Sequence, residues 1–228
     1  NSGGGADWID LGDGNDYVRA DGGRETFFGG NGHDTISYYH SNNGVTVNLQ
    51  TNAVSGSRAG NDAAVDFESV SGSSTGDDKI TGTAGANTIK TYGGNDRVYG
   101  GAGDDNVQLG GGDDYVRVGG GSESFYGGSG KDFINYYDST DGVRINLGTN
   151  AVSGGWASDD VIDSFERVGG SNLGDDKLYG GNGSDVMTGG ADDDTIRGGG
   201  GDDSIDGGTG TDTAVFSGDL ADYTITGD

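Results

Sequence analysis

The chain has 228 residues, with 52 Gly, no Pro, no Cys and only 30% hydrophobic residues. Its net charge of −26, from 38 acidic and 12 basic residues, argues against nucleic acid or an anionic membrane surface as a partner, because phosphate binding needs clustered Lys and Arg. The absence of Cys excludes disulfides and zinc–thiolate sites, and the sequence contains neither a signal peptide nor a run of 18 apolar residues.

The first run of repeats covers residues 2–37, in four consecutive units of nine residues. Each unit has a Gly-rich first half, an acidic sixth residue and an apolar eighth residue. So little apolar material would normally predict disorder, but the period places every apolar side chain on one side of the chain. The run therefore predicts short strands that stack into a solenoid with a thin core. Its sixth residues are Asp7, Asp16, Glu25 and Asp34, and its eighth residues are Ile9, Val18, Phe27 and Ile36.

The nine-residue register is then interrupted at residues 38–72, here called the first insert. The alternation of Val45, Val47 and Leu49 predicts a strand with one buried face. A second short strand is expected around residues 67–70. We expect the insert to continue the solenoid.

A second run of seven units covers residues 73–135, and a second insert covers residues 136–170. A third run of five units covers residues 171–215, and residues 216–228 are predicted to form a capping strand. Because repeat-like sequence reaches both ends, we expect the chain to be a segment of a longer protein. The sixth residues are Asp78, Asn87, Asp96, Asp105, Asp114, Glu123 and Asp132 in the second run, and Asp176, Asp185, Asp194, Asp203 and Asp212 in the third.

A larger repeat of 98 residues lies over the small one. A shift of 98 residues superposes the chain on itself without gaps, so that GVTVNLQTNAVSG matches GVRINLGTNAVSG. Both copies carry Glu in place of Asp at the same point, as Glu25 and Glu123. The inserts are therefore regular parts of a 98-residue module.

The nonapeptide has the chemistry of a calcium site. Gly at positions one, two and four permits tight turns that residues with a Cβ cannot make. Such turns direct carbonyl oxygens to their concave side, and the sixth residue adds a carboxylate. Ca²⁺ prefers six to eight oxygen ligands of these kinds. Turns that are 18 residues apart would lie one strand spacing apart in the stack, about 4.8 Å, so a cation between them would remove the repulsion of their carboxylates.

The units resemble the RTX, or hemolysin-type, calcium-binding repeat family, whose pattern is GGxGxDx-apolar-x. Six units carry the full pattern, starting at Gly29, Gly100, Gly127, Gly180, Gly198 and Gly207. The resemblance implies an all-β fold, a right-handed parallel β-roll or β-solenoid, with each ion between turns n and n+2. It also implies that the ligands are Asp carboxylates and backbone carbonyl oxygens of the Gly-rich turns.

Carried over to this sequence, the resemblance implies about ten Ca²⁺ ions, or roughly +20 against the formal −26. The implied carboxylate ligands are Asp7, Asp16, Asp34, Asp78, Asp96, Asp105, Asp114, Asp132, Asp176, Asp185, Asp194, Asp203 and Asp212. The implied turn glycines are Gly100, Gly101, Gly103, Gly127, Gly128, Gly130, Gly180, Gly181, Gly183, Gly198, Gly199, Gly201, Gly207, Gly208 and Gly210.

The expected pairs of carboxylates are not equal. Seven pairs are Asp with Asp: Asp16–Asp34, Asp78–Asp96, Asp96–Asp114, Asp114–Asp132, Asp176–Asp194, Asp194–Asp212 and Asp185–Asp203. Three are weakened by another residue: Asp7–Glu25, Asn87–Asp105 and Asp105–Glu123. We therefore predict that the all-Asp edge of the second run is filled with calcium and that the opposite edge is weaker or partly empty.

The energetics predict that folding depends on calcium. One buried Ile or Val per unit contributes about 1.5–3 kcal/mol, whereas ordering nine residues costs on the order of 9–18 kcal/mol of backbone entropy. We expect the metal-free chain to be largely unfolded, with metal binding as its folding energy.

The predicted function is structural: a calcium-binding scaffold and folding driver in a protein exported by type I secretion, located outside the cell or on its surface. No catalytic residues are predicted, since the GSSTG at residues 72–76 lies in a roll turn and no HExxH motif is present. One alternative is an accessory module of an exported protease, lipase or alginate epimerase that contacts polysaccharide through exposed aromatics. Another is a surface-layer, adhesin or filament subunit that assembles through the solenoid ends.

Four acidic residues of the inserts have two interpretations. Asp62 and Glu68 recur as Asp160 and Glu166 in the second copy. They could bind a further ion or simply cap the loop. The rows of aromatic residues likewise favour cross-strand ladders, with stacking on sugar rings as the alternative.

Overall fold

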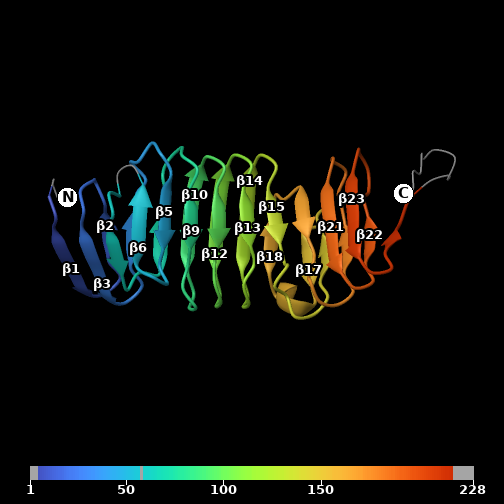
Figure 1. The fold of residues 1–228 in the computed structure, drawn as a ribbon, viewed down its shortest axis with the longest axis horizontal. Helices are drawn as coiled ribbons and strands as arrows, with labels where there is room; N and C mark the ends of the chain where they lie inside the picture. Colours follow the sequence, from blue (N-terminus) through green and yellow to red (C-terminus); the bar gives the residue numbers. More distant parts are fainter. Residues whose placement is uncertain (1–4, 57–58, 218–228) are drawn as a thin grey trace.

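The computed structural model describes residues 5–56 and 59–217 of the chain. Within them the regular secondary structure is almost entirely β strand, and the one helix is a single 3₁₀ turn, η1 (Gly155–Ala157). The strands stack side by side along one long axis, with β1 (Trp8–Asp13) at one end and β23 (Ser204–Thr209) near the other (Figure 1). Among the described residues no helix has the length and apolar character needed to cross a membrane.

The remaining strands are short, and those of six residues extend into the Gly-rich start of the next unit. Those of the first run and first insert are β2 (Tyr17–Arg19), β3 (Thr26–Asn31), β4 (Thr35–Ser37), β5 (Val45–Asn48), β6 (Ala53–Gly56), β7 (Ala63–Val65) and β8 (Ser69–Ser71). The second run contributes β9 (Lys79–Thr81), β10 (Thr88–Gly93), β11 (Arg97–Tyr99), β12 (Asn106–Gly111), β13 (Tyr115–Arg117), β14 (Ser124–Ser129) and β15 (Phe133–Asn135). The rest are β16 (Arg144–Asn146), β17 (Ala151–Ser153), β18 (Val161–Asp163), β19 (Arg167–Gly169), β20 (Lys177–Tyr179), β21 (Val186–Ala191), β22 (Thr195–Arg197) and β24 (Thr213–Ala214).

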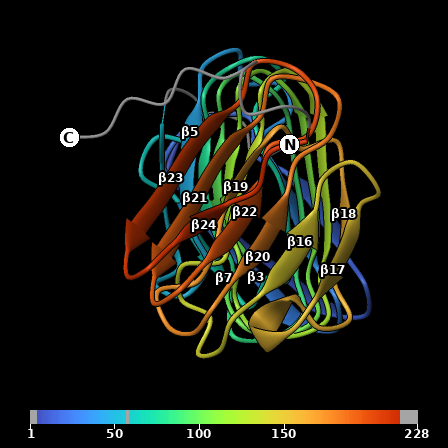
Figure 2. The ribbon, with the colours of Figure 1, turned by 90° about the vertical axis from the view of Figure 1, so that its right-hand side faces the viewer.

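The repeats form the predicted parallel β-solenoid. Two nonapeptides make one coil, and each strand pairs in parallel with the strand 18 residues away, so Val98 lies beside Val116 and Val116 beside Ile134. These eighth residues point inward and are fully or almost fully buried. The all-β parallel architecture expected from the nine-residue period is thus confirmed. Figure 2 looks along the stack from its C-terminal end.

The inserts contain the exceptions to parallel pairing. β5 and β6 form an antiparallel hairpin in which Val47 faces Val54, and β16 and β17 form its counterpart. The hairpins close because Asn52 and Asn150 adopt left-handed backbone angles, with φ of 58° and 56°, which Asn tolerates better than most residues. The parallel order expected from the repeats is therefore broken by one antiparallel strand in each insert, and β6 also runs antiparallel to β7.

Each insert returns the chain to the stack beside the coil it left. β7 pairs with β3 at an offset of 37 residues, since Thr26 lies beside Ala63, and β8 pairs with β4 at an offset of 34, since Thr35 lies beside Ser69. The second insert repeats both offsets, with β18 beside β14 and β19 beside β15. The interruption is therefore accommodated as an extra hairpin beside a normal coil.

The two hairpins lie on opposite sides of the solenoid. β5 and β6 belong to a 12-stranded sheet with β1, β3, β7, β9, β11, β13, β15, β19, β21 and β23. β16 and β17 belong to the other side, where a 7-stranded sheet from β2 to β18 is followed by a 5-stranded sheet from β17 to β24. Seven units separate the inserts, an odd number of half-coils, so the second insert begins half a coil further round.

The predicted capping strand at residues 216–228 lies largely outside the described residues, which end at residue 217.

Candidate calcium sites

The sixth residue of each unit lies in the turn just before a strand and is tied to the next coil. The backbone N–H of Asp78 donates to Oδ1 of Asp96 at 2.7 Å, and Asp96 donates in the same way to Asp114. All seven predicted Asp–Asp pairs, and also Asn87–Asp105, show this bond at 2.7–3.1 Å. One oxygen of the accepting carboxylate thus fixes the register between coils, which leaves its second oxygen for a different partner.

The second oxygen is buried and lacks a donor in most of these carboxylates. A buried polar atom without a partner costs about 1–3 kcal/mol, more if it is charged, so each one indicates a missing partner. Carboxylate oxygens call for a cation, and the residues present therefore fit Ca²⁺. The Oδ2 atoms concerned belong to Asp7, Asp16, Asp34, Asp96, Asp105, Asp114, Asp132 and Asp194.

The first glycine of the unit makes room for this oxygen. A Cβ built on Gly100 would lie 2.2 Å from Oδ2 of Asp105, and the same clash occurs between Gly127 and Asp132, Gly180 and Asp185, Gly198 and Asp203, and Gly207 and Asp212. A Cβ on Gly180 would also lie 2.0 Å from the carbonyl oxygen of Gly198 in the next coil. Carboxylate and carbonyl oxygens therefore converge where only glycine leaves space.

The second and fourth glycines lie against carbonyl groups of the preceding coil. A Cβ on Gly128 would approach the carbonyl oxygen of Gly110 to 2.0 Å, and one on Gly130 that of Gly112 to 1.9 Å. Gly101, Gly103, Gly199, Gly201, Gly208 and Gly210 are stacked in the same way, each at a positive φ. Gly181 lacks the positive φ, and Gly183 faces open space.

The sixth residues form two columns, one along each edge of the solenoid. The column before the 12-stranded sheet contains Asp78, Asp96, Asp114 and Asp132, and it continues through the second insert to Asp185 and Asp203. The opposite edge carries Asp16 and Asp34 near one end and Asp176, Asp194 and Asp212 near the other. A groove of about 950 Å³ follows the column at Asp78, Asp96 and Asp114.

The predicted ligands differ in burial and in partners. Those in the middle of the stack are buried, whereas Asp7, Asp16 and Asp203 are half-buried and Asp212 is exposed. Asp78 already has donors for both oxygens, from the N–H groups of Val45 and Ser73, and Asp176 has the equivalent pair. These two carboxylates anchor the hairpins as well as starting a column.

Burial makes the metal-free carboxylates resist ionisation. Desolvation is the largest cause, and it raises the pKa of Asp78 and Asp132 to about 6 and that of Asp105 and Asp114 to about 7. Neighbouring carboxylates in the column add to the rise at Asp114. Ionising these columns at neutral pH therefore costs free energy unless a cation compensates their charge.

A second ladder, which the sequence reasoning missed, runs along the fifth residues. The N–H of Asn95 donates to Asp77, that of Asp113 to Asn95 and that of Lys131 to Asp113, at 2.7–2.9 Å. These side chains are more exposed than the sixth residues. The frequent occurrence of Asp and Asn at position five of the units was the signal for this ladder in the sequence.

The acidic residues of the inserts take over the role of the sixth residue. The N–H of Asp34 donates to Glu68 at 2.8 Å, and that of Asp132 donates to Glu166 at 3.0 Å. Asp62 and Asp160 accept in the same way from Glu25 and Glu123. Where each insert returns to the stack, an acidic residue of the insert therefore continues each column. The recurrence of these four residues in both copies of the 98-residue module was the signal in the sequence.

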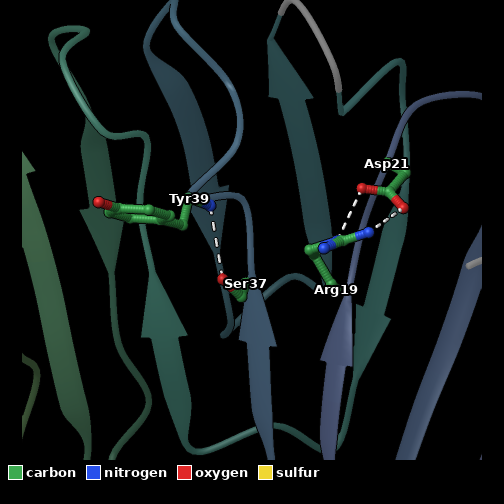
Figure 3. A network of polar contacts seen from close by, with 4 residues as sticks. All are labelled: Arg19, Asp21, Ser37 and Tyr39. Carbon is green, nitrogen blue, oxygen red and sulfur yellow. Dashed lines mark hydrogen bonds and ion pairs between the residues drawn. The ribbon is translucent and has the colours of Figure 1, made fainter.

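The exposed aromatic residues pack on their neighbours along the stack. Trp8 stacks on Phe28, with ring centroids 4.4 Å apart, and Tyr115 meets Phe133 edge to face at 5.3 Å. In the first run, Arg19 forms a bidentate pair with Asp21, and the N–H of Tyr39 donates to Ser37 nearby (Figure 3). These contacts stiffen the outer faces of the sheets.

Within residues 5–56 and 59–217, no group of three or more His, Cys, Asp and Glu gathers as a conventional metal centre would. The sites instead pair two carboxylates with carbonyl oxygens.

Comparison with curated proteins gives no match. The RTX calcium-binding nonapeptide repeat matches residues 1–36, 73–107, 99–134, 172–195 and 179–214, which together make up more than half of the chain. The chain therefore belongs to the RTX calcium-binding repeat family, and its nonapeptides form a calcium-binding β-roll.

Proposed function

We propose that this segment is a folding module of an exported protein, unfolded without calcium and folded by it outside the cell. The observation that carries the proposal is the row of buried carboxylate oxygens without donors, including those of Asp96, Asp114 and Asp132. A chain in this state cannot form a stable stack at neutral pH, because its columns repel themselves. Family membership supports export by type I secretion.

The residues divide the work of folding between them. The eighth residues supply most of a thin apolar core, and the N–H bonds to Oδ1 set the register of successive coils. The Gly-rich turns hold carbonyl oxygens beside the remaining Oδ2 atoms. Bound calcium supplies positive charge that cross-links adjacent coils and neutralises the columns.

We further propose that the module acts as a scaffold and spacer and carries no catalytic site of its own. The geometry that supports this is the use of the buried Asp side chains in coil-to-coil contacts.

Circular dichroism of the 228-residue chain tests the folding proposal. In excess chelator at pH 7.5 we expect most of the β signal to disappear, and in millimolar Ca²⁺ we expect it to return. Mg²⁺ at the same concentration is the control, since it demands a tighter octahedral site than these turns provide. An unchanged β spectrum in chelator would contradict the proposal.

A second candidate function is contact with an acidic polysaccharide. Lys79, Arg97, Tyr115, Phe133 and Arg167 follow one another on adjacent strands of the 12-stranded sheet. The row borders the groove of about 950 Å³, and it suits a chain of sugar carboxylates once calcium neutralises the aspartates that line the same groove. Calorimetry with oligogalacturonate should show binding that Arg97→Ala and Tyr115→Ala together abolish. A neutral oligosaccharide is the control, and equal heats from both sugars would exclude this function.

A further inference from the structure

Each insert builds a buried group of two carboxyls and a tyrosine that the nonapeptide pattern does not contain. In the first copy, the N–H of Glu25 donates to Oδ1 of Asp62 at 2.9 Å, and the hydroxyl of Tyr38 donates to Oδ2 at 3.3 Å. In the second copy, Glu123, Asp160 and Tyr136 repeat these bonds at 3.0 Å and 3.0 Å. The group therefore occurs twice, once on each side of the solenoid.

The glutamate of each group lacks the partners that its burial requires. Glu25 and Glu123 are each 1% exposed, and neither Oε1 nor Oε2 of either residue has a hydrogen-bond partner. The aspartate, in contrast, is satisfied by the N–H and the tyrosine hydroxyl. Four buried carboxylate oxygens, two in each copy, thus need a positive partner.

Carbonyl oxygens of the preceding coil lie close to the glutamate of each group. A Cβ on Gly23 would lie 1.9 Å from Oε1 of Glu25 and 2.9 Å from the carbonyl oxygen of Gly5. In the second copy, a Cβ on Gly121 would lie 3.2 Å from Oε1 of Glu123 and 2.3 Å from the carbonyl oxygen of Gly103. Both glycines have positive φ, of 139° and 157°. The turn backbone thus brings a carbonyl oxygen close to the glutamate carboxylate in both copies.

We propose that each insert completes one additional calcium site, formed by Glu25 and Asp62 in the first copy and by Glu123 and Asp160 in the second. The proposal rests on the calcium-dependent folding proposed above, and it joins a glutamate of each repeat run to an aspartate of the insert that belongs to no nonapeptide pair. Tyr38 and Tyr136 act as positioning residues that hold the aspartates. Oxygen ligands without sulfur or imidazole select a hard cation, hence Ca²⁺.

The competing explanation is a proton shared between the two carboxyls. Burial raises the pKa of Asp62 to about 7 and that of Glu123 to about 9, so a protonated pair would be stable without metal. The two explanations differ in the number of ions bound, which makes them separable.

Native mass spectrometry of the whole chain in Ca²⁺ tests the proposal. Asp62→Asn and Asp160→Asn keep one oxygen to accept the N–H, and their amide NH2 can donate to the tyrosine oxygen in place of the bond from its hydroxyl. Each should lower the number of bound ions by one, or by two when combined. Asp10→Gln is the matched control, because it removes one charge from an exposed residue whose equivalent in the second copy is Gln108. Unchanged ion numbers in the double variant would overturn the proposal in favour of the shared proton.

Crystals of the unaltered chain grown in Tb³⁺ give a second test that needs no variant. Anomalous peaks between Glu25 and Asp62 and between Glu123 and Asp160 are expected. Peaks in the Asp columns but none at these two points would contradict the insert sites and leave the proposed calcium-dependent folding intact. A chain that binds no ion anywhere would instead refute the proposed function itself.

Discussion

The second run and the first insert solve the same problem, a stable stack of strands, by different means. Nine buried apolar residues lie in the described part of residues 38–72, and the same number lie in residues 73–135, a segment nearly twice as long. The run, with fewer buried apolar residues for its length, carries acidic columns in which several carboxylate oxygens lack donors. In the insert, both carboxyl oxygens of Asp62 have donors.

This contrast indicates where the stability of each part comes from. The insert has a true hydrophobic core around Tyr38, Val47 and Phe67, all at most 2% exposed. The run has a thinner core, and under the proposed function its coils gain cohesion when the columns are neutralised. Changes to apolar residues should therefore matter most in the inserts, and changes to acidic residues should matter most in the runs.

The largest effect is expected from Phe67→Ala in the insert. Truncating a buried Phe costs about 3–5 kcal/mol, so the free energy of unfolding in saturating Ca²⁺ should fall by about this amount. Thermal or denaturant unfolding measures it. Phe165→Ala, at the equivalent position of the second insert, should behave alike, and the number of bound ions should not change in either variant. A loss of ions would mean that insert and run are not separable in this way.

The next effect is expected from Asp96→Asn combined with Asp114→Asn in the run. Three pairs lose charge, although Asn still accepts the N–H bonds, so the Ca²⁺ midpoint for folding should rise about a hundredfold, or about 2.8 kcal/mol. A calcium titration followed by circular dichroism measures the shift. Asp10→Gln combined with Asp206→Gln removes the same charge from exposed positions and should leave the midpoint unchanged. Equal shifts in both double variants would show that only net charge matters.

A smaller effect is expected from pH. Carboxyls whose pKa is raised in the folded state favour folding when protonated, so the metal-free stack should be most stable below pH about 4 and lose stability as the pH rises through about 6 to 7. The pKa values of Asp78, Asp105, Asp114 and Asp132 set this window. In chelator, acidification from pH 7.5 to 5 should increase the β signal.

With calcium present the direction reverses, since protons compete with the ion. The Ca²⁺ midpoint should rise about tenfold between pH 7.5 and 5.5. A midpoint that does not depend on pH would exclude the sixth residues as ligands.

The smallest effect is a difference in occupancy between the two edges of the second run. The edge of Asp78, Asp96, Asp114 and Asp132 should be fully loaded, and the edge of Asn87, Asp105 and Glu123 should be lower. Anomalous scattering from crystals at limiting and saturating metal gives both values. Equal occupancy at saturation would remove the predicted asymmetry.

Much of the fold followed from the sequence because the repeat is periodic. The inward position of Val98, Val107 and Val116 and the stacking of Asp96 on Asp114 needed only the nine-residue count. The same arithmetic could not give the offsets of 37 and 34 residues, because these depend on how the hairpin of β5 and β6 folds back.

The acceptor role of Glu68 and Asp62 was equally hidden. Both residues lie outside the nonapeptide register and reach their column only through that return of the chain. Their recurrence at a 98-residue spacing marked them as important, but it did not say for what.

The odd number of units between the inserts has a consequence for shape. Each hairpin makes its own side of the stack longer by two strands, about 10 Å at one strand spacing each, which on its own would bend the solenoid away from that side. Because the hairpins alternate, the two bends oppose each other. Gain or loss of a single nonapeptide in residues 73–135 would bring both hairpins to one side and add their bends. The parity of the repeat count therefore decides between a straight rod and an arc, independently of any side chain.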